Sequence, residues 1–153
     1  MKLGIAVNDL GASQLNFLLI QRANELVGSR RDLDIILFYE NIVRPCLPMN
    51  FAVMQIAECW GFDGPVVATT FNTAEKLLRF PSSPRKLFYV WDLEWTRMRQ
   101  KLFRSLLSVY GNPDLTLLAR CQDHADAIRQ CWNREALVVE DCDLDRIIEV
   151  AGK

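Results

Sequence analysis

The sequence predicts an α/β fold: a doubly wound, mostly parallel six-stranded Rossmann-like sheet with helices on both faces. Short β-rich runs alternate with longer segments of helical period along the whole chain. Several runs are apolar at consecutive positions, which is typical of parallel strands covered on both faces. Each run is followed by a segment long enough to cross over the sheet, and right-handed crossovers place helices on both faces.

Six runs rich in aliphatic and aromatic residues are the expected strands. They cover residues 2–8, 33–39, 65–70, 86–91, 115–120 and 136–140.

Helix ends are marked by capping and breaking residues. Ser13 is a suitable N-cap for a first helix that ends near Gly28, and Asn50 for a second that ends at Gly61. The apolar stripe of the first is Leu15, Leu18, Leu19, Ala23 and Leu26, and the inward residues of the second are Val53, Ile56, Ala57 and Trp60.

Four further helices are expected. One opens at Asn72 or Thr73 and finishes before Pro81, because proline cannot continue a helix. The next begins at Thr96 and closes at Gly111. The last two cover residues 122–132 and 144–151.

Length and composition indicate one domain over residues 1–153. Half of the chain is hydrophobic and 24% is charged, which excludes a disordered chain, and a net charge of −1 argues against nucleic acid as a partner. Five cysteines in a chain of this size favour a reducing compartment over a disulfide framework. No apolar run approaches the roughly 18 residues of a membrane helix. We therefore expect a soluble, cytoplasmic protein with no transmembrane segment.

Candidate functional residues follow the expected strands, since ligands of open parallel sheets bind beyond the carboxyl ends of the strands. Polar loops at strand ends occur in every α/β domain, so a purely structural rim is the alternative. The candidate ligand-binding residues are Asn8, Asp9, Thr70, Asp92, Glu94, Arg120 and His124, and the same rim includes Tyr39, Glu40, Thr69, Asp141 and Asp143.

The first strand end carries neither the GxGxxG nor the GxxxxGK[ST] phosphate-binding pattern. We therefore expect no nucleotide cofactor. Gly11, just before the first helix, is either a structural turn or a donor of free N–H groups to an anion.

The segment from Trp91 to Trp95 is the most unusual in the chain. Its carboxylates, Asp92 and Glu94, are flanked by two indoles. Acidic groups bind sugar hydroxyls and an aromatic ring packs on a sugar face, so the pattern favours carbohydrate recognition. In the alternative, both tryptophans are core residues and one carboxylate favours a helix N-terminus.

His124 is the only histidine and is a candidate for proton transfer or phosphate contact, with an incidental role as the alternative. The spacing of Cys121, His124, Cys131 and Cys142 matches no standard zinc site, so we expect no metal.

Charge is segregated along the chain. Arg97, Lys101 and Arg104 are expected on one helical face, whereas residues 135–149 hold six acids and only Arg146 as a base. The basic stripe suits phosphate, anionic lipid headgroups or an acidic partner, and the two regions together suit self-association. A solvated helix face is the alternative.

The order of residues 4–9, then 65–70 with Thr73, then 86–94 resembles the amino-terminal half of two-domain glycosyltransferases of the B-type fold. Those proteins carry a threonine-rich third segment, a short helix, and a strand that ends in a tyrosine, a glutamine and two spaced acids. Tyr89, Asp92 and Glu94 match, and Trp91 stands in place of the glutamine. Small stand-alone proteins of this kind occur in tailed phages of marine cyanobacteria.

The resemblance implies a module that binds a glycan or sugar-phosphate acceptor. In that family a second domain binds the sugar nucleotide, so transfer would need a separate donor-binding subunit. The alternative is a non-catalytic phage structural or host-interaction protein on the same scaffold. Either version implies a location in the host cytoplasm or the virion.

Overall fold

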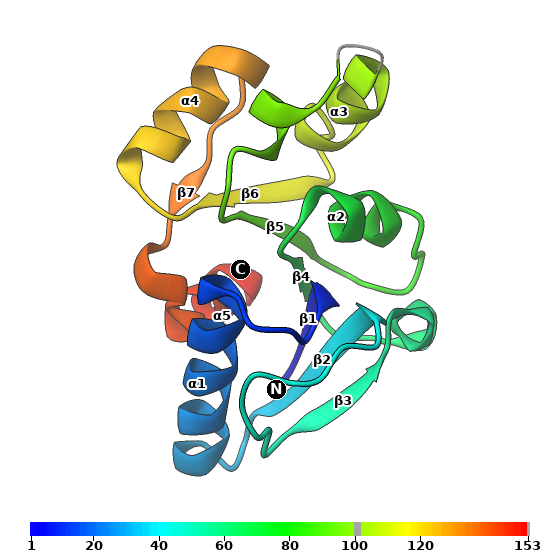
Figure 1. Ribbon diagram of the computed structural model, residues 1–153, viewed down its shortest axis with the longest axis vertical. Helices are drawn as coiled ribbons and strands as arrows, with labels where there is room; N and C mark the ends of the chain where they lie inside the picture. The colour runs from blue at the N-terminus through cyan, green and yellow to red at the C-terminus, as the bar shows by residue number, and fades with distance from the viewer. Residues whose placement is uncertain (100–101, 153) are drawn as a thin grey trace.

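The computed structural model describes residues 1–99 and 102–152, which form one seven-stranded sheet (Figure 1). Its strand order is β3-β2-β1-β4-β5-β6-β7, and every adjacent pair is parallel. The order reverses between β1 and β4, which is the point where doubly wound folds open a crevice. The expected α/β class and doubly wound parallel sheet are confirmed, with one strand more than the six expected.

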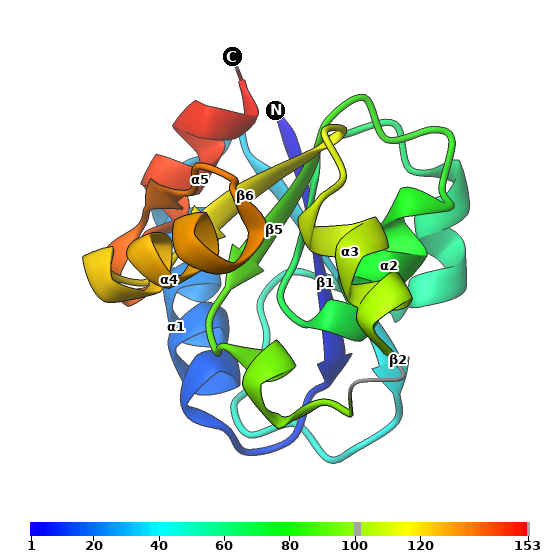
Figure 2. The same ribbon diagram turned by 90° about the horizontal axis from the view of Figure 1, so that it is seen from above.

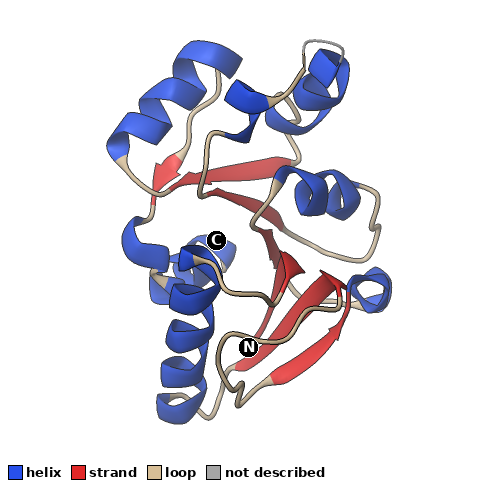
Figure 3. Cartoon of the chain, in the orientation of Figure 1, coloured by secondary structure: helices blue, strands red, loops and turns tan. Residues whose placement is uncertain are grey.

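The strands closely follow the apolar runs of the sequence. Each is flanked by a turn or helix that carries the chain back to the amino edge of the sheet (Figure 3). They are β1 (Lys2–Asp9), β2 (Asp34–Asn41), β3 (Ala52–Gln55), β4 (Val66–Ala68), β5 (Lys86–Val90), β6 (Leu115–Ala119) and β7 (Leu137–Val138).

Five α-helices and three described 3₁₀ turns connect the strands (Figure 3). The helices are α1 (Gln14–Ser29), α2 (Phe71–Leu78), α3 (Phe103–Tyr110), α4 (Gln122–Trp132) and α5 (Leu144–Ala151). The turns are η1 (Ile56–Gly61), η2 (Glu94–Arg97) and η4 (Glu140–Cys142).

The sheet separates two apolar cores. On one face, α1 and α5 pack with Leu19 and Ile147 on a layer that includes Ile5 and Leu37 of the strands. On the opposite face, α2, α3 and α4 pack on a layer that includes Ala6 and Phe88. The consecutive apolar residues of β1 and β5 are explained by this arrangement, because alternate side chains enter different cores.

The prediction of a helix from Asn50 to Gly61 is wrong. Residues 52–55 form β3, which pairs with β2, and η1 follows it. Trp60, expected to point inward, is 56% exposed. Pairing with the edge of β2 supplies interstrand hydrogen bonds that outweigh a weak helical pattern, and so short an edge strand gives little signal of its own.

The helix expected from Thr96 also differs. Residues 94–97 form η2, and α3 begins only at Phe103. Arg97 and Arg104 therefore lie on different elements and not on one helical face, while Lys101 lies outside the described residues. The closure at Gly111 is confirmed as the C-cap.

The remaining helix boundaries are close to expectation. Ser13 caps α1 by accepting a hydrogen bond from Asn16 N, and α4 and α5 have the expected bounds. The helix expected to open at Asn72 or Thr73 begins at Phe71, since Thr70 is its N-cap.

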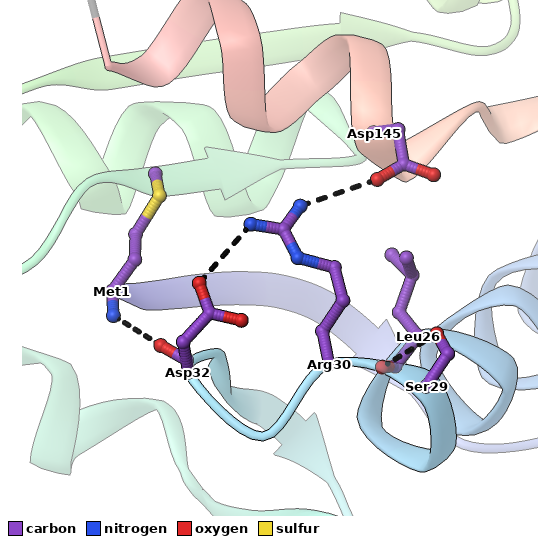
Figure 4. Close-up of polar contacts among 6 residues, drawn as sticks. All are labelled: Met1, Leu26, Ser29, Arg30, Asp32 and Asp145. Carbon is purple, nitrogen blue, oxygen red and sulfur yellow. Dashed lines mark hydrogen bonds and ion pairs between the residues drawn. The ribbon is translucent and has the colours of Figure 1, made fainter.

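Arg30 links the amino edge of the sheet to α5 (Figure 4). Its guanidinium lies 3.3 Å from a carboxylate oxygen of Asp32 and 3.3 Å from one of Asp145. The amino group of Met1 donates to the Asp32 carbonyl. Both termini lie at this edge (Figure 2), on the side of the sheet away from the carboxyl ends of the strands.

No helix among residues 1–99 and 102–152 has the length and apolar character to cross a bilayer.

Candidate functional site

The polar residues expected at the strand ends do lie along one edge of the sheet. All seven strands are parallel, and Figure 2 shows the central strands pointing toward one edge. Asn8 and Asp9 at the end of β1, Thr70 after β4, and Asp92 after β5 therefore share this carboxyl edge. Hydrogen bonds and ion pairs divide these residues into separate groups along that edge.

Arg120 and Trp91 form the central pair. Val90 and Ala119 are partners in the β5–β6 register, so Trp91 and Arg120 are the next residues on neighbouring strands. The Arg120 guanidinium carbon lies 4.3 Å from the centroid of the Trp91 ring, a cation–π contact. Among the described residues, Arg120 has no side-chain hydrogen bond or ion pair. Its in-plane N–H groups are therefore available to a ligand.

A pocket of about 250 Å³ opens beside this pair. It lies between the first residue of α1, the ends of β5 and β6, and the turn after β7. Half of its lining residues carry a charge: one guanidinium and two exposed carboxylates. The lining residues are Gln14, Trp91, Arg120, Cys121, Glu140 and Asp141.

Tyr89 holds the acidic turn in place at this pocket. Its hydroxyl donates to the carbonyl of Val139 at 2.8 Å and accepts from Cys142 N at 3.1 Å. Burial raises the pKa of Tyr89 above its ordinary value, with nearby Cys142 adding to the effect, so the phenol remains a donor. Asp141, between the two bonded positions, has a left-handed backbone with φ of 47°. The bonds to Tyr89 stabilise this less favourable conformation.

The turn after β1 satisfies its own polar groups. Asp9 Oδ1 accepts from Gly11 N at 2.8 Å, and the amide of buried Asn16 donates to the carbonyls of Asp9 and Gly11. The N–H of Gly11 is therefore used inside the turn, in agreement with the structural alternative. The carbonyl of Asn8 accepts a bond from Asn41.

Thr70 and Glu94 both bind the first turn of α2. Thr70 and Thr73 form a capping box at its N-terminus. The Glu94 carboxylate accepts from Phe71 N at 2.8 Å. Burial raises the pKa of Glu94, the bond from Phe71 opposes the shift, and neighbouring Asp92 adds to it.

Asp92 and His124 lie apart from the pocket lining. Asp92 is exposed and pairs with Arg97. His124 is half-buried in the first turn of α4, and its Nδ1 is buried without a hydrogen-bond partner among the described residues. Both residues follow strands that end at the carboxyl edge, as the sequence predicts. Contact of either residue with a ligand remains a prediction.

A larger hollow of about 500 Å³ lies between α1 and α5. Three of its carboxylates have structural partners: Asp145 pairs with Arg30, Asp143 caps α5, and Glu25 pairs with Arg22. Its other two acids, Glu140 and Asp141, also line the smaller pocket, and the one arginine of the hollow, Arg22, is the partner of Glu25. We therefore place the candidate site at the smaller pocket, where the only guanidinium has no partner of this kind.

Metal ligands are not gathered at the edge. Across the described parts of the chain, no three His, Cys, Asp or Glu side chains are grouped as a metal ion would require.

Gln14 and Glu140 are pocket residues that the sequence pattern did not single out. Gln14 follows the N-cap of α1, and Glu140 was expected inside a strand but lies in η4. The position of each relative to Arg120 depends on how α1 and β7 pack across the sheet. The one available signal was the position of Arg120 and Trp91, each the first residue after an apolar strand.

Comparison of the chain with protein-family models, with curated proteins and with solved structures gives no match. Any function proposed for the chain is therefore argued from its own residues and structure.

Proposed function

We propose that the chain binds a sugar phosphate or glycan acceptor at the carboxyl edge of its sheet. Transfer of a sugar to that acceptor would use a donor-binding subunit supplied by another polypeptide. The observation that carries the proposal is Arg120, stacked at 4.3 Å on Trp91 and without an ion-pair partner among the described residues.

The chemistry of the pocket suits such a ligand. A guanidinium binds phosphate through two parallel N–H donors, and stacking on an indole orients those donors while leaving them uncovered. The carboxylates of Glu140 and Asp141 are acceptors for sugar hydroxyls on the other wall. Since Glu94 already binds α2 and Asp92 pairs with Arg97, we assign hydroxyl recognition to Glu140 and Asp141.

The size of the pocket favours a small ligand. Pockets for drug-sized ligands run from roughly 300 to 1,000 Å³, and this one has about 250 Å³. One monosaccharide unit with its phosphate is a better match than a dinucleotide. The lack of a glycine-rich phosphate loop after β1 agrees with that choice.

Titration followed by tryptophan fluorescence and calorimetry tests the proposal. The probes are glucose 6-phosphate, glucose and inorganic phosphate, with UDP-glucose as the donor control. We expect saturable binding of glucose 6-phosphate. Loss of a charge-assisted bond, about 1.5–3 kcal/mol, predicts that Arg120→Gln weakens it by about tenfold or more.

Arg129→Gln is the matched control, because Arg129 is an exposed arginine of α4 paired with Asp126. It should bind as the wild type does. Failure of every sugar probe to bind, or equal binding by Arg120→Gln, would contradict the proposal and favour a non-catalytic interaction protein.

A further inference from the structure

The outer side of α3 carries an exposed apolar surface, which shares no residue with the lining of the Arg120 pocket. Leu106, Val109 and Tyr110 of α3 are buried in the core, whereas Phe103 and Leu107 point outward and are 57% and 49% exposed. Their i, i+4 spacing places them on one face of the helix. We call Leu102, Phe103 and Leu107 the α3 apolar face; Leu102, the N-cap, is 39% exposed.

An apolar pocket adjoins this face. It has a volume of about 300 Å³ and is lined by Trp95, Met98, Arg99, Phe103, Leu106, Cys131 and Trp132. Trp95 and Trp132 meet edge to face at 5.8 Å, and Phe103 stacks on Trp132 at 6.0 Å. The outward apolar side chains therefore continue into an aromatic wall instead of standing singly, and contiguous patches of this kind mark interaction sites.

Two exposed arginines adjoin the α3 apolar face. Arg99 and Arg104 are exposed, and neither has an ion-pair partner among the described residues. In the sequence, no acid occurs between Glu94 and Asp114, whereas four basic residues do. A partner that matches this surface has apolar groups for the α3 apolar face and anionic groups beside them for the two arginines.

We propose that this surface docks on an anionic lipid bilayer. In that arrangement Phe103 and Leu107 enter the boundary between headgroups and acyl chains, while Arg99 and Arg104 extend to the lipid phosphates. Indoles favour the same interfacial depth, which suits Trp95 at the pocket wall. Nucleic acid would bind the arginines but gain nothing from the exposed phenylalanine and leucines.

Vesicle co-sedimentation tests the proposal. The two vesicles are phosphatidylcholine alone and phosphatidylcholine with 30 mol% phosphatidylglycerol, a composition chosen at roughly the anionic content that gives a strong surface potential. We expect binding to the anionic vesicles only, and weaker binding at high salt, because salt screens the attraction. Each of Arg99→Gln and Arg104→Gln should weaken binding about fivefold.

The double variant Phe103→Ser with Leu107→Ser should abolish binding while the arginines remain. Ile42→Ser is the matched control, because Ile42 is 80% exposed on the loop after β2 and distant in sequence from α3. The arginine variants change only exposed side chains, so they remain informative if the double variant unfolds. Absence of binding to anionic vesicles, or binding unaffected by these changes, would overturn the proposal. So would a dimer in analytical ultracentrifugation that Phe103→Ser dissociates, since a second copy would then cover the face.

Discussion

The carboxylate of Glu94 accepts a hydrogen bond from the backbone N–H of Phe71 across 2.8 Å. The bond joins the turn after β5 to the first residue of α2, where the helix has N–H groups without an intrahelical partner. Two residues 23 positions apart thus order the carboxyl edge between β4 and β5. The capping box of Thr70 and Thr73 completes the same helix end.

Replacement of Glu94 by alanine should lower the free energy of unfolding. The change leaves a part-buried N–H without its acceptor, and such a loss costs about 1–3 kcal/mol. Urea denaturation followed by circular dichroism measures it. Asp92→Ala is the control, because Asp92 is exposed and pairs only with exposed Arg97, so it should change stability by less than about 1 kcal/mol. Equal effects of the two variants would contradict a structural role for Glu94.

The pH dependence of stability should also depend on Glu94. Its folded-state pKa is raised, mainly by burial, so the folded protein favours the protonated acid. The stabilising contribution is therefore complete below the unfolded pKa and declines as pH rises through the folded pKa. Glu94→Gln removes this titration, so its stability relative to the wild type should rise as the pH increases above about 4.3, the ordinary pKa of a glutamate. A relative stability that falls or stays level over this window would show that the carboxylate is not held as described. Glu135→Gln makes the same substitution at an exposed acid and is the control variant.

Tyr89→Phe should destabilise the fold without opening a large cavity. The phenol is fully buried, and its removal leaves both the Val139 carbonyl and Cys142 N without their partner. Two orphaned buried groups cost about 2–6 kcal/mol together, from a typical 1–3 kcal/mol each. Thermal and urea unfolding measure the change. A loss under about 0.5 kcal/mol would mean that other groups or water replace the hydroxyl.

Thr70→Ala should cost about 1 kcal/mol, the usual value of an N-cap side chain. Thr70→Ser keeps the hydroxyl that accepts from Thr73 N and should restore most of the stability. Thr70 does not line the Arg120 pocket, so neither variant should change the affinity for glucose 6-phosphate. The two readouts, unfolding and glucose 6-phosphate titration, thus separate capping from binding.

Much of the architecture could be predicted from apolar runs and capping residues. Ser13, Gly111 and the consecutive apolar residues of β1 give local signals, and the folded chain has the cap, the helix end and the strand that they predict. β3 could not be predicted, because a four-residue edge strand depends on the presence of β2 beside it. The delayed start of α3 has a similar cause: Trp95 is drawn against Tyr110 and Trp132, which keeps residues 94–97 in a tighter turn.

The sequence predicts that the candidate site lies at the carboxyl edge of the sheet, but it does not predict which side chains are in contact there. Arg120 follows an apolar strand and could be placed at the carboxyl edge from sequence. Its stacking on Trp91 requires the β5–β6 register, and its distance from the acids of η4 requires the packing of β7. In the sequence, Glu94 and Asp92 are equivalent candidates for ligand binding. In the structure, Glu94 instead accepts a hydrogen bond from the N-terminal residue of α2.

The attachment of β7 through Tyr89 has a consequence for amide hydrogen exchange. Only two residues of β7 pair with the sheet, so η4 depends for its order on the phenol of Tyr89 in β5, two strands away. We expect the amides of residues 139–143 to exchange together, through a partial opening well below the global unfolding free energy. The amides of β1 and β4, at the centre of the sheet, should exchange only when the whole molecule unfolds. Occupation of the Arg120 pocket would then slow exchange in the acidic turn first.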